Sequence, residues 1–302
     1  MSCRDSGKRM CGRIRAVLTK LIPKRWWRGT AVVPVVRLSG VIGAVTPLRP
    51  GMTLAGVAKT LERAFAVDNA KAVALVVNSP GGSPVQSRQI YLRIRQLAQE
   101  KELPVLVFVE DVAASGGYMI ACAGDEIFCD PSSILGSIGV VGSSFGFTEL
   151  IRKIGVERRL YTAGEHKATL DPFLPENPDD VGRLKAIQRE IHATFIELVK
   201  ASRGERLKGT DDLLFTGEYW AGERSVALGL ADAVGDLRST LRDRFGDKVS
   251  TPLIAPSTGL LSGLFGRKAG AGTTTSFDGI AGLPDGLISA LETRAIWARF
   301  GF

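Results

Sequence analysis

Short apolar runs alternate with longer segments of mixed polarity between residues 32 and 203, and this alternation constrains the fold more than any other feature of the chain. The apolar runs predict strands and the segments between them predict helices. Strands are expected at 32–38, 72–77, 105–109, 126–129, 138–141 and 156–161, and helices at 54–67, 85–99, 147–154 and 179–203. Apolar strands separated by helices indicate an α/β protein with a buried, mostly parallel sheet.

A serine stands where one predicted strand gives way to the next apolar segment. Ser115 lies in Ala-Ala-Ser-Gly-Gly-Tyr at 113–118, after the run 105–109 and before a second run at 119–123. The N-terminus of a helix favours negative charge, so a nucleophilic oxygen is well placed there. Serine is also a common helix N-cap. The hexapeptide alone therefore leaves a catalytic and a capping role open.

A nucleophilic serine needs a base, which is usually histidine held by a carboxylate. The sequence has two histidines. His192 falls on or beside the apolar stripe of the predicted helix 179–203, which favours a packing or surface role. His166 adjoins Lys167 in Thr-Ala-Gly-Glu-His-Lys at 162–167. A lysine can replace the histidine where burial and nearby positive charge lower its pKa, so both neighbours are candidate bases.

Four motifs, in this order along the chain, resemble those of peptidase family S49, which includes the signal peptide peptidase A and SohB proteins. They are Asn-Ser-Pro-Gly-Gly at 78–82, Ala-Ser-Gly-Gly-Tyr at 114–118, Gly-Ser-Ile-Gly-Val at 136–140 and Ala-Gly-Glu-His-Lys at 163–167. The resemblance covers about residues 32–245, and the spacing of 52 residues from Ser115 to Lys167 fits the family pattern. It implies the ClpP/crotonase fold, in which repeated ββα units wind into a superhelix. Periodicity alone does not separate that fold from a doubly wound sheet.

The resemblance also implies roles for individual residues. Ser115 would be the nucleophile and Lys167 the general base and later the general acid, with no metal or other cofactor. Ser137 matches a hydroxyl that orients the lysine amine, although a turn at a strand end explains it equally well. The N–H groups of Gly82 and Gly116 would form the oxyanion hole, because glycine lets the backbone approach the oxyanion closely. Peptide substrates would bind by strand addition near Gly136, Ile138, Gly139 and Val140.

Two other classes of function compete with a serine endopeptidase. A crotonase-type acyl-CoA enzyme also polarises a carbonyl with two backbone N–H groups, but it has no need for a serine and lysine pair. A catalytically idle membrane scaffold is the second alternative, and the intact Ser115 and Lys167 argue against it. The expected substrates are extended, apolar peptides such as cleaved signal peptides or fragments of membrane proteins.

Composition agrees with an enzyme of ordinary size. A chain of 302 residues with 45% hydrophobic and 23% charged residues can bury a substantial core and is not a disordered protein. Its four cysteines form neither a CxxC nor a CxxH cluster, so the sequence indicates no metal site and no disulfide framework. Cys122 and Cys129 lie in apolar surroundings and are expected to be buried thiols, which favours a reducing compartment.

The net charge of +8 is concentrated at the N-terminus, where residues 1–29 carry nine basic side chains and one acidic one. Apolar residues fall at helical spacing among them and Trp26 and Trp27 follow, so a basic amphipathic helix is predicted. Such a helix favours an anionic membrane surface over nucleic acid, and a solvated extension is the plainer alternative.

The predicted organisation has three parts: a basic N-terminal segment at 1–31, a peptidase domain at 32–247, and a linker and tail rich in Gly, Ser and Thr at 248–302. No apolar run of about 20 residues predicts a transmembrane helix. We therefore expect a cytoplasmic protein at the inner face of the membrane, and the periplasmic side stays open as an alternative. Each motif occurs once, and the resemblance then implies a homo-oligomeric ring whose dyads form across subunits.

Overall fold

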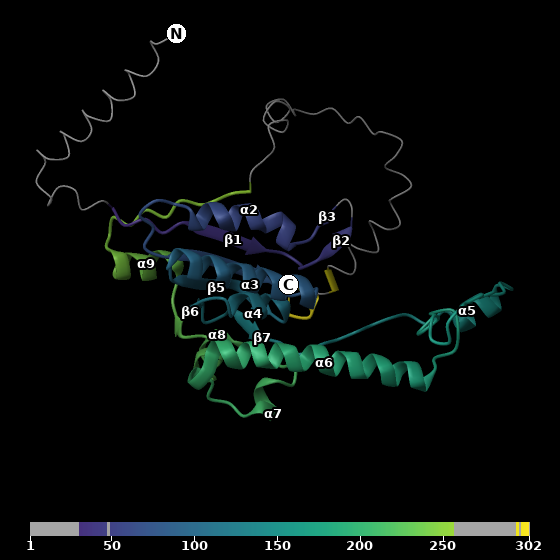
Figure 1. Ribbon diagram of the computed structural model, residues 1–302. Coiled ribbons are helices and arrows are strands. Elements are labelled where there is room, and N and C mark those ends of the chain that lie inside the picture. The colour runs from purple at the N-terminus through teal and green to yellow at the C-terminus, as the bar shows by residue number, and fades with distance from the viewer. Residues whose placement is uncertain (1–29, 47–48, 257–293, 296, 302) are drawn as a thin grey trace, which may run out of the picture.

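In the computed structural model, a mostly parallel sheet forms the centre of the molecule (Figure 1). The structure describes residues 30–46, 49–256, 294–295 and 297–301. The basic segment 1–29 and the greater part of the predicted tail lie outside the described residues. Residues 250–254 run beside the first strand of the sheet, where the N–H of Val33 donates to the carbonyl of Ser250 at 2.8 Å.

The main sheet has seven strands in its described part, and five of them follow the order β1-β4-β5-β6-β9. These five are β1 (Val35–Ser39), β4 (Val73–Ser79), β5 (Val105–Ala114), β6 (Glu126–Cys129) and β9 (Ala233–Val234). They pair in parallel. The strand β7 (Ile134–Gly136) pairs in parallel with the last residues of β5 and antiparallel with β8 (Tyr219–Ala221). A separate hairpin joins β2 (Ala44–Thr46) to β3 (Arg49–Pro50).

Helices cover both faces of this sheet. One face packs against α2 (Leu54–Phe65), α3 (Pro84–Lys101) and α4 (Gly116–Ala121), and the other packs against α9 (Leu237–Phe245). Local sequence explains where the first two helices begin, because Thr53 and Ser83 cap α2 and α3 through their side-chain oxygens. The predicted α/β class is confirmed, and strand–helix units around a mostly parallel sheet agree with the ClpP/crotonase fold.

The long helix α6 (Pro178–Arg203) is anchored to the sheet by its C-terminal half only. Phe195, Leu198, Val199 and Arg203 of this half are buried. The N-terminal half projects from the body, and residues 144–177, which we call the distal arm, lead to its far end (Figure 1). The distal arm contains α5 (Thr148–Lys153). The remaining short elements are η1 (Gly204–Arg206), α7 (Asp211–Leu214) and α8 (Gly222–Ala227), which lead from α6 back to the sheet.

Four predicted helices and four predicted strands are confirmed with small shifts of their ends, but two predicted strands are wrong. Residues 138–141 form no strand, because Gly136 and Ser137 both have positive φ values, 112° and 53°, which turn the chain out of the sheet after β7. Residues 156–161 also form no strand and lie exposed on the distal arm, where no described strand is available to pair with them. Among the described residues, no helix is both long and apolar enough to span a membrane.

Candidate active site

Ser115 occupies the sharp junction between β5 and α4. Its backbone has φ 52° and ψ −123°, a conformation that is strained for any residue with a side chain. It stands at the N-cap position of α4, yet its side chain makes no capping hydrogen bond. The capping interpretation therefore fails, and the strain agrees with a hydroxyl that is held for another purpose.

A glycine-rich turn after β4 lies directly against this junction. A Cβ atom on Gly81 would stand 2.8 Å from the Ser115 Cβ and 2.9 Å from the Gly116 nitrogen. A Cβ on Gly82 would stand 2.0 Å from the carbonyl oxygen of Ile42, and one on Gly116 would stand 3.4 Å from the Gly82 nitrogen. A Cβ atom at these positions would clash with or crowd its neighbours, and the close packing brings the backbone amides of Gly82 and Gly116 near each other beside Ser115.

A cavity of about 690 Å³ opens beside Ser115. Several of the predicted site residues line it, namely Gly82, Ser115, Ser137, Gly139 and Val140. Ser137 is half-buried, and its backbone N–H donates to the carbonyl of Glu218 at 2.7 Å. The cavity is large enough for several residues of a peptide, which is in the usual size range of ligand sites.

The segment after β7 presents unpaired backbone to this cavity. The carbonyl of Gly136 accepts from the N–H of Ser115 at 2.8 Å, and the carbonyl of Ser137 accepts from the N–H of Gly139 at 3.0 Å. Beyond this point the Gly139 carbonyl and the Val140 N–H have no hydrogen-bond partner among the described residues. Free groups of this kind can pair with an added strand.

A second, smaller pocket lies beneath Ser115, and sequence reasoning missed it. Its apolar wall comes from Met119 of α4, from Ile191 and Phe195 of α6, and from Val140. The volume open to a bound group is only about 20 Å³. The spacing of four residues between Ile191 and Phe195 places them on one helix face, but nothing in the sequence indicates that this face would approach Ser115.

The described end of the chain forms one wall of the larger cavity, which the sequence also did not indicate. Arg299 and Phe300 line the cavity, and Phe300 is buried against Val112 and Ala114 of β5. Tyr219 holds this wall in place, because its hydroxyl donates to the Arg299 carbonyl at 2.9 Å and its ring lies 5.0 Å from that of Phe300.

The structure does not bring Lys167 to Ser115 within one chain. Lys167 is exposed in a turn of the distal arm, where its N–H lies 3.3 Å from the carbonyl of Gly164. The neighbouring His166 lines a different cavity, of about 490 Å³, on the distal arm. His192 lies on α6, and its Nε2 is 3.0 Å from the carbonyl oxygen of Ile138, so it packs at the edge of the Ser115 site.

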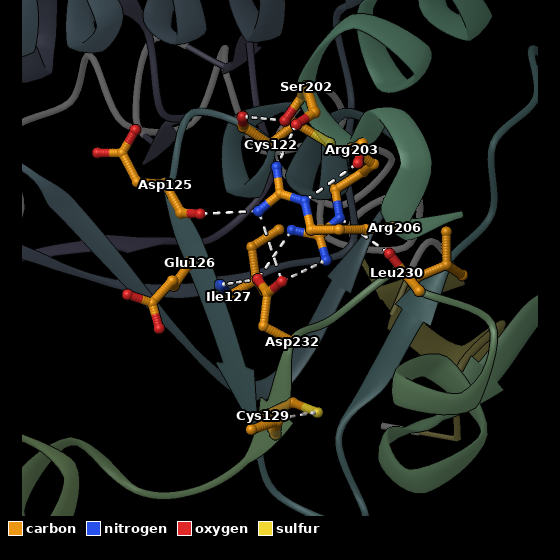
Figure 2. Close-up of polar contacts among 12 residues, drawn as sticks. Cys122, Asp125, Glu126, Ile127, Cys129, Ser202, Arg203, Arg206, Leu230 and Asp232 are labelled. Atoms are coloured by element: carbon orange, nitrogen blue, oxygen red, sulfur yellow. Dashed lines mark hydrogen bonds and ion pairs between the residues drawn. The ribbon is translucent and has the colours of Figure 1, made fainter. Parts of the chain in front are cut away.

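A buried ion pair ties the C-terminal end of α6 to the sheet (Figure 2). The Arg203 guanidinium is fully buried and donates to both oxygens of Asp232 at 2.9 and 3.0 Å. Asp232 also accepts from the N–H of Ile127 at 2.7 Å. Burial disfavours both charges, but the hydrogen bonds between them outweigh it, so the pKa of Arg203 is raised and that of Asp232 is lowered. The pair ties the end of α6 to the sheet.

Two further contacts join α4 to the same cluster. Ser202 donates to the carbonyl of Cys122 at 2.6 Å, and the Tyr118 hydroxyl donates to the carbonyl of Leu230 at 2.8 Å. Burial raises the pKa of the Cys122 thiol to about 12 and that of Cys129 to about 11, so both are inert buried thiols, as predicted. No group of three or more potential metal ligands occurs within the described ranges.

Comparison with known proteins places the chain in a family. The model described as "Peptidase family S49" matches residues 97–244. A Na(+)/H(+) antiporter NhaA of Brucella abortus is 56% identical over 287 residues, which cover 94% of this chain and 39% of that protein. A candidate protease of Synechocystis sp. is 30% identical over 191 residues, which cover 61% of this chain and 67% of that protein.

A solved structure of a membrane-bound stomatin-specific protease variant with a substrate peptide aligns with 78% of this chain and 97% of its own, at 17% identity and a TM-score of 0.46. The chain spans about two fifths of the length of the Brucella relative. The matched region of the family model contains Ser115, Ser137 and Lys167. The chain belongs to peptidase family S49.

Proposed function

We propose that this chain is a serine endopeptidase that uses Ser115 as nucleophile and Lys167 as base. The observation that carries the proposal is the geometry of Ser115. Ser115 occupies a strained strand–helix junction, its side chain makes no capping bond, and it lines a cavity with Gly82, whose turn packs against the Ser115–Gly116 junction. A hydroxyl of this kind, beside two backbone N–H groups, suits attack on a carbonyl.

The reaction would proceed through an acyl-enzyme. The Lys167 amine removes the proton from the Ser115 Oγ as that oxygen bonds to the carbonyl carbon of the peptide. The N–H groups of Gly82 and Gly116 stabilise the tetrahedral oxyanion. Lys167 then gives the proton to the leaving amine as the C–N bond breaks. Lys167 takes a proton from water as the water oxygen bonds to the ester carbonyl carbon. It then returns this proton to the Ser115 Oγ as the acyl–oxygen bond breaks, which releases the carboxylic acid and the free serine. Ser137 would orient the lysine amine.

The position of Lys167 supports a dyad that forms between two copies of this chain. A base needs burial to be neutral near pH 7, whereas Lys167 of a single chain is exposed on the distal arm. The same arm exposes large apolar side chains, including Phe145 at 74% and Tyr161 at 89% of their surface. Apolar surface of this extent indicates a contact with protein, and a second copy in a ring would cover it and bury Lys167.

We infer that the substrates are extended apolar peptides. The free backbone groups at Gly139 and Val140 would pair with a substrate strand. The small pocket beneath Ser115, lined by Met119, Ile191 and Phe195, would take the side chain that precedes the scissile bond. Its volume suits alanine and excludes a leucine or phenylalanine side chain. Cleaved signal peptides and fragments of membrane proteins supply such sequences.

We also propose that the chain works at the inner face of a membrane, held by the basic segment 1–29. The match to the Brucella relative, which is named as a Na(+)/H(+) antiporter, covers 94% of this chain and therefore includes part of this segment. Wild-type protein should sediment with anionic liposomes, less so as salt rises, because charges are screened beyond about 8 Å at physiological ionic strength. Unchanged sedimentation after deletion of residues 1–29 would contradict this placement.

Labelling with a fluorophosphonate probe tests the proposed function. The probe should modify wild-type protein at Ser115, and the Ser115→Ala variant should remain unlabelled although it folds. An acyl-CoA enzyme of the crotonase type has no activated serine and would not react. A membrane scaffold without activity would neither react nor cleave casein. Absence of labelling in folded, assembled wild-type protein would therefore reject the serine peptidase.

A further inference from the structure

A side chain of α6 contacts the backbone that would receive the substrate. Nε2 of His192 lies 3.0 Å from the carbonyl oxygen of Ile138, a residue 54 positions away in the sequence. A carbonyl oxygen only accepts hydrogen bonds, so Nε2 carries a proton and donates it. Ile138 is fully buried and lies between Ser137 and Gly139, both of which line the Ser115 cavity.

This segment has little support from the sheet. β7 ends at Gly136, and the last backbone hydrogen bond towards β8 runs from the Ser137 N–H to the carbonyl of Glu218, the residue before β8. The helix α6 replaces the sheet as its support. Residues 184, 188 and 192 are four apart and share one helix face. A Cβ on Gly142 would lie 2.9 Å from the Gln188 Nε2, so this face of α6 stays close to the segment beyond Ile138.

We propose that His192 is a positioning residue for the substrate strand. Its hydrogen bond fixes the Ile138 carbonyl against α6, and this holds the next two residues with their free Gly139 carbonyl and Val140 N–H at the cavity. The inference rests on the proposed function, because it assigns a role in binding extended substrates. His192 does not touch the reacting atoms, so its loss should weaken the binding of a peptide and leave the reactivity of Ser115 unchanged.

The test compares two probes on the assembled enzyme. One is an extended fluorogenic peptide, which must pair with the segment 139–140, and the other is a small fluorophosphonate, which needs only Ser115 and its immediate surroundings. His192→Ala should raise KM for the peptide about tenfold, the effect of one hydrogen bond. Its kcat and the rate of fluorophosphonate labelling should stay within about twofold of wild type.

Two further variants separate positioning from general stability. His192→Gln keeps a side-chain N–H donor and should recover most of the loss in KM. Glu197→Ala changes an exposed residue of the same helix, and its kinetics should match wild type. Thermal unfolding of each variant should be measured, and the comparison should be made well below the lowest midpoint.

Three results would overturn the inference. Equal loss of peptide cleavage and labelling in His192→Ala would show that the residue acts on the whole site. If His192→Gln were as impaired as His192→Ala, the side-chain N–H donor would not matter. A normal KM in both variants would show that His192 has no role in peptide binding. In each of these three cases the wild-type enzyme would still react with the fluorophosphonate, so the proposed function would stand. A wild-type enzyme that neither labels nor cleaves would reject the proposed function and this inference together.

Discussion

The backbone N–H of Ser115 donates a hydrogen bond of 2.8 Å to the carbonyl oxygen of Gly136. This bond continues the parallel pairing of Ala114 with Gly136 and joins the candidate nucleophile to the segment that runs on to Val140. The candidate nucleophile and the candidate substrate-binding backbone are therefore connected through β5 and β7. The candidate base, Lys167, lies apart from this site on the distal arm.

Ser115→Ala and Lys167→Ala should each reduce peptide hydrolysis by at least about a thousandfold, because a nucleophile and its base act as a unit and their losses do not add. The double variant should be no worse than either single variant. Lys153→Ala, at another exposed lysine of the distal arm, serves as the control and should keep wild-type activity. If Lys167→Ala turned over substrate nearly normally while His166 was intact, His166 would become the base.

Gly82→Ala should abolish activity and destabilise the fold. Gly82 and Gly40 both have positive φ values, 143° and 102°, so alanine at either site is strained by about 1–3 kcal/mol. A Cβ on Gly40 meets nothing within 4 Å, whereas one on Gly82 would stand 2.0 Å from the Ile42 carbonyl oxygen. Gly40→Ala is therefore a matched control for backbone strain alone.

Urea unfolding and peptide hydrolysis should separate these two variants. The loss of unfolding free energy should be larger for Gly82→Ala by about 1–3 kcal/mol, the effect of overpacking. Its kcat should also fall about a hundredfold or more, because the amide is displaced from the oxyanion position. Equal activity in Gly82→Ala and Gly40→Ala would show that the Gly82 amide does not contribute to the oxyanion hole.

Ile191→Ala should widen the small pocket beneath Ser115 and relax the preference for a small side chain before the cleaved bond. Removal of a few methyl groups from such a pocket changes discrimination about 10- to 200-fold. The ratio of kcat/KM for leucine over alanine at that position should rise by this factor. Ile196→Ala, at a partly buried isoleucine of the same helix, should leave the ratio unchanged. A ratio unaffected by Ile191→Ala would mean that the pocket is not the specificity site.

The ion pair of Arg203 with Asp232 should make stability depend on pH in the acid range. Folding lowers the pKa of Asp232 from its ordinary value of 3.8, so its stabilisation is complete above that value and is lost as the pH falls below it through the folded pKa. Asp232→Asn leaves the buried Arg203 charge without its partner and should reduce stability by about 3–5 kcal/mol at pH 7.

Chemical denaturation from pH 7 down to about pH 2 measures this difference. The difference in unfolding free energy between wild type and Asp232→Asn should become smaller as the pH drops below 3.8. The reason is that protonation of Asp232 then removes the charged partner of Arg203 from wild type as well. A gap that stayed constant across this range would show that Asp232 is not the carboxylate responsible.

The sequence predicted the strands and helices around Ser115 well, because buried strands and amphipathic helices leave clear periodic patterns. It failed for residues 138–141, where Ile138 is buried against α6 without pairing in the sheet. Burial alone produces an apolar run, so hydrophobicity does not distinguish a paired strand from a packed loop. The run 156–161 failed because its apolar side chains are exposed on the distal arm, as expected for a surface that meets another molecule.

The sequence predicted only those candidate site residues that belong to short local motifs. Ser115, Gly82 and Gly116 lie together because each belongs to a turn whose glycines are required by close backbone contacts. The pocket residues Ile191 and Phe195 and the cavity wall at Phe300 depend on how distant segments pack, and no local pattern in the sequence records that packing.

The central claim is that Lys167 of one subunit serves Ser115 of its neighbour, and mixing two inactive variants tests it most directly. Ser115→Ala and Lys167→Ala proteins should be combined under conditions that exchange subunits, with the mixed assemblies verified by native mass spectrometry. Some interfaces would then hold an intact serine beside an intact lysine, so part of the activity should return. No activity in verified mixed assemblies, or full activity in an isolated wild-type monomer, would contradict the claim, because the dyad would then have to form within one chain.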